Sequence, residues 1–482
     1  MERREIAIVG SGFSGLGMAI RLKQEGWSDF LVLERADDVG GTWREQTYPG
    51  SGCDVASRVY SFSFAQHDWR ATISPRSEIH EYLRGCAERF GVRPHVRLNC
   101  TVLSADWDDA ERRWRIATTD GEISARFLIV ATGPMSEPVI PAYPGLERFE
   151  GAAFHSARWG PDDAIDGKRV AVIGTGSSGA QIVPAIQPRV ARLALLQRTP
   201  AWVIPKMQRR TTAFERRLYR KVPVARRSAR VALFATYESV GFLLRHPRVI
   251  RAVGRAIWSL GKLQIRDPEL RRKLRPTTEM GCKRMIRSND FYPAIGRPNV
   301  DLVTAPIAEI GPRSVLTADG THHEVDTIVF ATGFRMTDPP MHERIRGRSG
   351  IPLSEVWRRD GMRALRGTTV ADCPNLFLLV GPNTGTGNNS LVFIIESQIA
   401  YVLDALRTLK NRGAAAAEPR PEAVASYNDR IEALLDGTVW ETGCASHYLD
   451  RDGRNVVLWP DFMFRFRRET RAFDAGEYLL EQ

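Results

Sequence analysis

Two glycine-rich segments of the sequence have the residue types and spacing that bind phosphate groups. Both read G-x-G-x-x-G, and their glycines are Gly10, Gly12 and Gly15 in the first segment and Gly174, Gly176 and Gly179 in the second. The backbone N–H groups of such a turn, with the N-terminus of the following helix, can hold the pyrophosphate of a dinucleotide. One motif of this kind is a weak signal, whereas two in a strand–turn–helix context predict two dinucleotide-binding folds.

The charged residue expected beside the adenosine ribose differs between the two segments. Glu34 stands 24 residues after Gly10. Arg198 stands at the same distance after Gly174 and is followed by Thr199. A carboxylate at this position accepts hydrogen bonds from ribose hydroxyls, whereas an arginine accommodates a 2′-phosphate. We therefore expect FAD at the first site and NADPH, in preference to NADH, at the second; the alternative is that both residues are solvated charges at strand ends.

A flavin fold and an NADPH fold in one chain indicate hydride transfer to the flavin, followed by transfer of electrons to another acceptor. The six cysteines, Cys282 and Cys444 among them, form no C-x-x-C pair and have no zinc-site spacing, which argues against a disulfide reductase. We expect six free thiols in a reducing cytoplasm and no metal. Molecular oxygen is then the expected electron acceptor.

Short apolar strands and the helices after them must position the glycine turns. Strands are expected at 6–9 and 170–173, with helices after the turns to about 24 and 186 and the next strands at 30–33 and 193–196. Two further apolar strands, at 127–133 and 326–333, both end in A-T-G. Buried strands with small residues at their ends are typical of a parallel sheet that meets a ligand at its carboxyl edge.

A third such strand, at 375–380, leads into the turn Gly381–Gly387 and a helix from about Ser390. The N-terminus of this helix carries partial positive charge and is expected to face the flavin ring, unless the turn is only a structural cap. Together these elements predict an α/β protein with two Rossmann-like dinucleotide-binding domains.

The first domain, which binds FAD, is expected to be discontinuous and to comprise 1–155 and 340–482. The second, which binds NADP, is expected at 156–339, and a basic helical insertion at about 206–275 interrupts it.

The chain has 482 residues and a net charge of +12, and it contains no apolar run of about 18 residues that could span a membrane. Its first residues, MERREIAIVG, lack the apolar core of a signal peptide, so we expect a cytoplasmic protein. The basic excess is local, because 206–275 holds 20 Lys and Arg against four Asp and Glu. In a protein that binds nucleic acid the basic residues are spread more widely, so we expect no nucleic-acid partner.

Three interpretations of the insertion are open: a lid over the substrate, solvated charged faces of packed helices, or a surface that meets anionic lipid. Its apolar residues are interleaved with charges along the sequence. We therefore expect no stable attachment to membranes.

The segment between the two folds contains Phe149, Gly151, His155 and Trp159 in the spacing F-x-G-x-x-x-H-x-x-x-W. It resembles the fingerprint of type I Baeyer–Villiger monooxygenases. Further segments match the same family: Gly40–Trp43, Tyr48–Gly50 leading to Asp54, Gly281–Arg284, Gly381–Gly385, Gly443–Ser446 and Leu458–Pro460. The resemblance covers about residues 5 to 475 and is closest to the branch that acts on aryl and open-chain ketones.

The resemblance implies an enzyme that uses FAD, NADPH and O2 to insert one oxygen atom into a ketone through a C4a-peroxyflavin, which gives an ester or a lactone. Negative charge develops in this reaction, and the resemblance assigns its stabilisation to Arg284, a fixed and always protonated cation. Asp54 is implied to orient Arg284, and Lys283 to reach the 2′-phosphate of the coenzyme. Gly151, His155 and Trp159, in the linker between the domains, are implied to have structural or conformational parts.

The same resemblance extends the two sets of cofactor-binding residues. The FAD set adds Arg35, Gly41, Thr42, Trp43, Asp54, Tyr60 and Val102 to the first turn and Glu34. The NADPH set adds Thr175, Ser177, Ser178 and Thr199 to the second turn, Arg198 and Lys283.

Two positions depart from that branch of the family. Asn388 stands where histidine is common, and His447 stands where tryptophan is common, so the shape of the substrate cannot be carried over. Two alternative functions are kept: a flavoprotein that oxygenates nitrogen or sulfur and needs no fixed cation, and a flavin-binding protein without catalytic activity. The particular ketone and the oligomeric state are left open.

Overall fold

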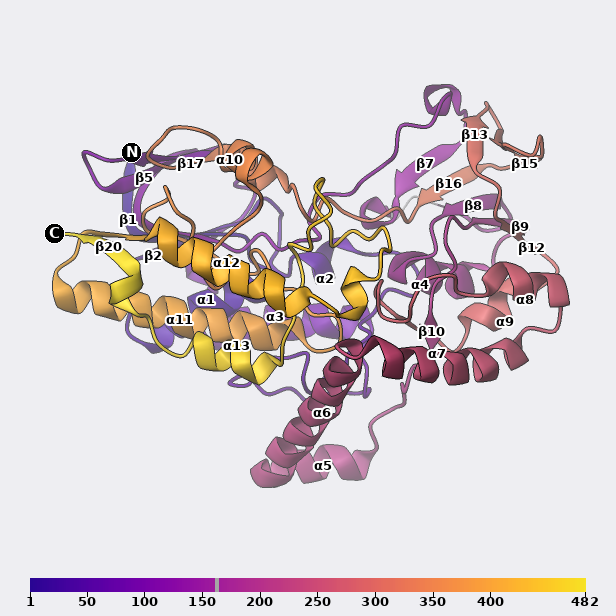
Figure 1. Ribbon diagram of the computed structural model, residues 1–482, viewed down its shortest axis with the longest axis horizontal. Coiled ribbons are helices and arrows are strands. Elements are labelled where there is room, and N and C mark those ends of the chain that lie inside the picture. Colours follow the sequence, from indigo (N-terminus) through magenta and orange to yellow (C-terminus); the bar gives the residue numbers. More distant parts are fainter. Residues whose placement is uncertain (161–163) are drawn as a thin grey trace.

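The computed structural model describes residues 1–160 and 164–482, and two sheets with covering helices dominate it (Figure 1). The first sheet has the order β17-β4-β5-β6-β1-β2-β3, and β18 also pairs with β6. Its strands are β1 (Glu2–Val9), β2 (Phe30–Leu33), β3 (Val96–Arg97), β4 (Val102–Asp108), β5 (Arg113–Thr118), β6 (Gly121–Val130), β17 (Ile345–Arg346) and β18 (Leu376–Leu378). Both antiparallel pairings involve β5, and every other pairing is parallel.

The central strands of the first sheet are apolar because both of their faces are covered. All four residues of β2 are buried, as are the last four of β1. Helices α1 (Phe13–Gln24), α3 (Arg76–Arg89) and α11 (Leu391–Arg412) contribute buried side chains to one apolar core with these strands. The expected helix to Gln24 and strand at 30–33 are confirmed.

The second sheet has the order β12-β9-β8-β16-β7 and is parallel throughout. Its strands are β7 (Ala152–His155), β8 (Arg169–Ile173), β9 (Arg192–Leu196), β12 (Val300–Val303) and β16 (Thr327–Phe330). Helices α4 (Ser177–Ile186) and α9 (Phe291–Ile295) pack against each other and share an apolar core with this sheet. A small antiparallel sheet joins β13 (Ile307–Ile310), β14 (Ser314–Thr317) and β15 (His322–Glu324) beside it.

The strand that carries the fingerprint histidine differs from the sequence expectation. His155 pairs with Phe330 at the end of β7, so it belongs to an edge strand of the second sheet and not to a linker. Ala152–His155 has only four residues and is only partly apolar, so its sequence pattern does not identify it as a strand. The second sheet therefore begins a few residues before the expected domain boundary at 155.

The chain returns to the first sheet after the second sheet ends, since β17 pairs with β4 and β18 pairs with β6. The basic segment is mostly helical, as expected. It forms α5 (Ala213–Lys221), α6 (Pro223–Leu244), α7 (Pro247–Gly261) and α8 (Pro268–Leu274). In Figure 1, α5 and the adjoining half of α6 project from the body of the molecule, whereas α7 and α8 run along the second sheet.

The remaining elements complete the two units. They are α2 (Thr42–Glu45), α10 (Leu353–Asp360), α12 (Pro421–Leu435), α13 (Met463–Glu469), β10 (Val203–Ile204), β11 (Ile286–Arg287), β19 (Ala416–Pro419) and β20 (Tyr478–Glu481). In the part of the chain that is described, no helix combines the length and the apolar character needed to cross a bilayer.

Candidate active site

The two glycine turns have the same construction. A Cβ atom on Gly10 would lie 2.8 Å from the Ala131 carbonyl oxygen, and one on Gly174 would lie 2.5 Å from that of Ala331. Both glycines also adopt a positive φ, of 100° and 113°, which disfavours any other residue. The third glycine of each motif, Gly15 or Gly179, approaches the carbonyl oxygen of the first so closely that a Cβ has no room. These glycines therefore let the helix pack directly against the strand.

The middle glycine of each turn instead faces open space. A Cβ on Gly176 would meet no atom within 4 Å, and one on Gly12 would meet only the Cα of Gly41, at 3.7 Å. Gly41 itself has a φ of 52° and precedes α2. Backbone without side chains therefore lines a cradle at each turn, beside the N-termini of α1 and α4. This is the surface that a pyrophosphate group requires, so the residues present fit two dinucleotides.

Glu34 is buried directly after β2 and beside the first turn. Its carboxylate accepts hydrogen bonds from the Ser11 amide at 2.8 Å and the Ser11 hydroxyl at 2.6 Å, and from the Ala36 amide at 2.9 Å. Three donors fix the carboxylate at the carboxyl edge of the sheet, which is where a ribose would lie.

Arg198 lies at the corresponding edge of the second sheet, directly after Gln197 and the end of β9. It is exposed and forms no ion pair with any described residue. Burial lowers the pKa of Lys283, and the nearby positive charge of Arg198 lowers it further. Neither cation forms an ion pair with a carboxylate of the described residues, so the two can attract an anion. Thr175 and Thr199 lie beside them, and the Thr175 hydroxyl donates to the Thr199 carbonyl oxygen at 3.1 Å.

Asp54 and Arg284, which are 230 residues apart in the sequence, form a bidentate ion pair. The Arg284 Nε and Nη2 atoms donate to the two Asp54 carboxylate oxygens at 2.8–3.0 Å. Burial alone would raise the Asp54 pKa, but the Arg284 guanidinium outweighs burial and holds that pKa below its usual range. The Asp54 carboxylate in turn raises the Arg284 pKa. Both side chains therefore stay charged across the physiological pH range.

Three chain segments meet at this ion pair. Arg284 Nη1 donates to the Thr386 carbonyl oxygen at 3.4 Å, so the turn after β18 contacts the cation. The segment before Asp54 packs against α4 of the second sheet, because the Tyr48 hydroxyl donates to the Gln181 side chain at 2.9 Å. The pair thus lies where the two dinucleotide-binding folds contact each other, and Lys283 extends from it toward Arg198.

Helix α6 contributes two residues to this region that the sequence analysis did not identify. The Tyr237 hydroxyl accepts a hydrogen bond from the Ala56 amide at 2.9 Å, two residues after Asp54. The Glu238 carboxylate accepts from the Asn389 side chain and from the Met463 amide, both at 2.9 Å. Burial raises the Glu238 pKa. The insertion therefore contacts both the Asp54 segment and the turn after β18. In the sequence, the only signal for these contacts is the adjacent pair Tyr237 and Glu238 within a basic helix.

Asn388, one of the two positions that depart from the family, also contacts this helix. Its side-chain amide donates to the Tyr237 carbonyl oxygen at 2.6 Å. The inner side of α6 is consequently connected to the active-site turn by both Asn388 and Asn389.

Cys282 and Cys444 form a disulfide, with Cα atoms 6.4 Å apart. The expectation of six free thiols is therefore wrong, and the other four cysteines are free and buried. Spacing along the chain could not reveal the pair because its members are 162 residues apart. The bond connects the segment of Arg284 to the loop that carries His447 and the buried Tyr448.

The fingerprint residues lie around the edge strand β7. His155 is buried, and its Nδ1 accepts a hydrogen bond from the Ala157 amide at 3.1 Å. Burial lowers the His155 pKa to about 4, so the ring is neutral. A Cβ on Gly151 would lie 2.3 Å from the Asp326 carbonyl oxygen, which explains the glycine. The Trp159 carbonyl oxygen accepts from the Thr47 hydroxyl at 2.6 Å and so connects the second sheet to the segment before Asp54.

The other expected FAD-binding residues surround the first turn. Trp43, on α2, donates from its indole nitrogen to the Tyr60 hydroxyl at 3.3 Å, and Thr42 begins that helix. Arg35 follows Glu34 and pairs with Glu137 and Glu45. Val102 is buried at the start of β4. At the second turn, Ser177 and Ser178 begin α4.

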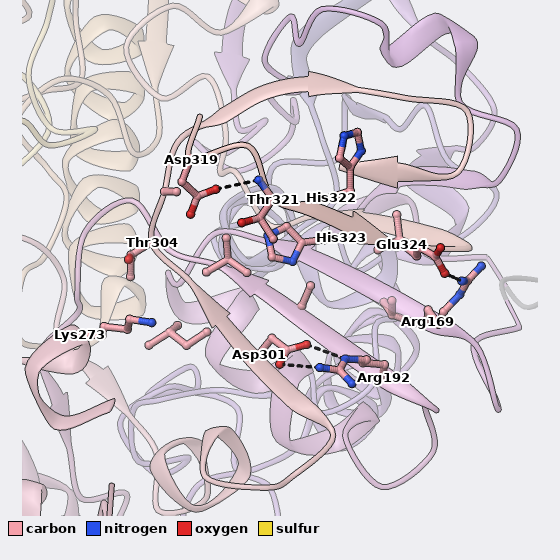
Figure 2. Close-up of a pocket in the computed structure, with 16 residues that line it drawn as sticks. Arg169, Arg192, Lys273, Asp301, Thr304, Asp319, Thr321, His322, His323 and Glu324 are labelled. Carbon is pink, nitrogen blue, oxygen red and sulfur yellow. Dashed lines mark hydrogen bonds and ion pairs between the residues drawn. The ribbon is translucent and has the colours of Figure 1, made fainter. Parts of the chain in front are cut away.

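A cavity of about 800 Å³ lies against the second sheet and is lined by the starts of β8 and β9, by residues 301–305 and by β15 (Figure 2). Arg169 and Arg192, which begin β8 and β9, line it, whereas the glycine turn and Arg198 follow the ends of these strands. Its cations are already neutralised: Arg192 pairs with Asp301 at 2.7 Å, and Arg169 pairs with Glu324. It is therefore separate from the coenzyme site. Among the described residues, no cluster of His, Cys, Asp and Glu is arranged to hold a metal.

Comparisons with known proteins agree with this geometry. The model of the flavin-binding monooxygenase-like family matches residues 3–225. A Baeyer–Villiger monooxygenase of Streptomyces coelicolor is 47% identical over 99% of this chain and 92% of its own length. A Baeyer–Villiger monooxygenase of Pseudomonas aeruginosa is 44% identical over 99% of this chain and 91% of its own length. The chain belongs to the flavin-binding monooxygenases and, among these, to the Baeyer–Villiger type, which is NADPH-dependent.

Solved structures show the same architecture. An oxidised steroid monooxygenase bound to NADP has a TM-score of 0.89 and 31% identity, with 99% of both chains covered. A cyclohexanone monooxygenase from Rhodococcus sp. Phi1, bound to NADP+, has a TM-score of 0.88 and 28% identity, with 100% of this chain and 99% of that one covered.

Proposed function

We propose that this chain inserts one atom of molecular oxygen into a small ketone and gives an ester or a lactone, with FAD as its bound cofactor and NADPH as its reductant. The observation that carries this proposal is the bidentate Asp54–Arg284 pair at the contact between two dinucleotide folds. When bound, FAD accepts a hydride from NADPH and activates oxygen. The particular chemistry on the substrate then depends on the residues of the chain.

The first and second turns hold the two dinucleotides in this proposal. Gly12 and Gly41 provide bare backbone for the FAD pyrophosphate, and Glu34 accepts hydrogen bonds from its ribose. Gly176 provides the matching surface for NADPH, and Arg198 with Lys283 binds the 2′-phosphate. The exposure of Arg198 and its lack of an ion pair within the described part of the chain support this assignment.

Arg284 stabilises the negative charge that develops on the ketone oxygen when the carbonyl carbon gains a fourth substituent. A cation that is already fixed needs no reorganisation during the reaction and acts strongly where water is excluded. Asp54 fixes two of its nitrogens, and the Thr386 carbonyl oxygen contacts a third. Oxygenation of nitrogen or sulfur produces no such alkoxide, so the ion pair favours ketones over the alternative substrates.

The proposal is tested with the FAD-loaded protein, NADPH, oxygen and a panel of cyclic, open-chain and aryl ketones. Mass spectrometry should find products that gain one oxygen atom, with one NADPH consumed per product. Amines and sulfides, assayed in parallel, should give little product. Oxidation of those compounds without conversion of any ketone would instead assign the chain to nitrogen or sulfur oxygenation.

The cytoplasmic location remains a prediction, which fractionation of the source cells would test.

A further inference from the structure

The outer side of α5, α6 and α7 exposes apolar and basic side chains together. Phe214 on α5, Val224 on α6 and Leu260 on α7 are 75%, 70% and 69% exposed, respectively. We call this surface the arm face and define it by the exposed residues of 213–263. Single exposed apolar residues are ordinary, but several on consecutive helices indicate an interaction surface.

Helix geometry gathers apolar residues that are scattered in the sequence. Val224, Val231, Ala235 and Phe242 are exposed on α6 at spacings of seven, four and seven residues, which places them on one stripe. Tyr237 lies on the other side of the helix, whereas Glu238, seven residues after Val231, lies on the same stripe; both are buried and contact the active-site segments. The stripe is therefore covered at Glu238 and exposed at the four apolar positions.

The arm is held firmly from its inner side. Arg216 forms a bidentate ion pair with Asp68, with the closer contact at 2.7 Å, and Arg230 donates to the Ser61 carbonyl oxygen at 2.9 Å. These contacts attach α5 and α6 to the segment 58–72 of the first domain. The arm thus has a defined position, and its helices α5 and α6 project from the body of the molecule (Figure 1).

The arm face is positively charged, although Arg251 on α7 pairs with Glu279 at 2.8 Å. Arg217, Arg220 and Lys221 are exposed and form no ion pair with a described residue. The two carboxylates of these helices are already used: Glu215 pairs with Arg209 at 2.6 Å, and Glu238 is buried. A partner must therefore be anionic and must also accept apolar side chains. A nucleic acid supplies only the anionic phosphates in quantity, whereas a bilayer with anionic lipids supplies both properties.

We propose that the arm face binds reversibly to the surface of a membrane that contains anionic lipid. Phe214, in the first turn of α5, and Val224, at the start of α6, enter the headgroup region, and the neighbouring cations contact lipid phosphates. This replaces the expectation of no membrane attachment, which rested on the interleaving of charged and apolar residues along the sequence. The contact is salt-sensitive because no lipid anchor or spanning helix is involved in it.

Sedimentation with vesicles tests this inference on the FAD-loaded, full-length protein. Vesicles of equal parts phosphatidylcholine and phosphatidylglycerol should carry the protein into the pellet at low salt, and high salt should release it. Vesicles of phosphatidylcholine alone should carry much less. Absence of the protein from the anionic pellet at low salt would overturn the proposal.

Variants on the arm face locate the contact. Phe214→Ser and the triple variant Arg217→Gln/Arg220→Gln/Lys221→Gln should each weaken binding, the triple variant by about tenfold or more, because each cation near an anionic surface contributes about fivefold. Matched controls are Leu103→Ser, an exposed residue of β4, and Arg412→Gln at the end of α11, and both should bind as the wild type does. All variants should keep wild-type NADPH oxidation.

Two outcomes would contradict the proposal even if the protein sediments. Equal binding by the arm variants and the controls would show that another surface contacts the lipid. A concentration-dependent dimer that Phe214→Ser dissociates, without vesicle binding, would show that the arm face is covered by a second copy of the chain.

Discussion

Arg284 has a bidentate carboxylate partner, a raised pKa, and a contact with the turn after β18. We predict that Arg284→Ala still binds FAD and still accepts hydride from NADPH, because the two turns and Arg198 are untouched. Oxygenation should slow roughly 10²–10³-fold, and peroxide should replace the ester. Stopped-flow reduction combined with product analysis measures both half-reactions. A near wild-type rate of ester formation would remove Arg284 from its proposed role.

At the same scale, Arg198 should determine the choice of coenzyme. Because it is exposed and no carboxylate in residues 1–160 or 164–482 pairs with it, its loss leaves no buried charge behind. We predict that Arg198→Ala weakens NADPH binding by about 1.5–3 kcal/mol and leaves NADH nearly unchanged. Steady-state kinetics with both coenzymes tests this, with Arg192→Ala at the opposite strand edge as the control. An equal loss with NADH would indicate a structural role.

Helix α6 is the element that connects the basic insertion to the reaction site. Tyr237→Phe removes the acceptor of the Ala56 amide and leaves this N–H without its partner, at a cost of about 1–3 kcal/mol where it is buried. We predict that the Asp54 segment loosens, so that less ester forms per NADPH consumed while flavin reduction keeps its rate. The ratio of product to NADPH measures this. Tyr219→Phe on α5 is the control, and the same ratio in both variants would show that α6 has no such effect.

Over the whole molecule, buried neutral histidines make stability depend on pH. His342 packs edge-on against Trp357, with ring centroids 4.6 Å apart. Burial lowers the His342 pKa to about 4, although the negative charge of Asp338 acts in the opposite direction. The unfolded chain binds the proton near pH 6.5, so this contribution to stability is complete above about pH 6.5 and is lost as the pH falls toward 4. His155 acts in the same direction.

Between pH 7.5 and pH 5, the free energy of unfolding should fall by about 2 kcal/mol less in His342→Phe than in the wild type. The phenyl ring keeps the contact with Trp357 and cannot bind a proton. Urea unfolding at the two pH values measures the difference, and His322→Phe, on the exposed strand β15, should show the wild-type dependence. An unchanged pH dependence in His342→Phe would mean that His342 is already accessible to protons in the folded protein.

The sequence by itself determined the two strand–turn–helix units, the different charges after their second strands, and the family. These features are local: a glycine turn needs particular residues at fixed spacing, and a buried strand needs a short apolar run. Tertiary structure decided that Asp54 meets Arg284 across 230 residues, that Cys282 pairs with Cys444, that β7 joins the second sheet, and that α6 contacts the active site through Tyr237 and Glu238. Such contacts depend on how distant segments pack, and the periodicity of one segment contains no information on which other segment it will meet.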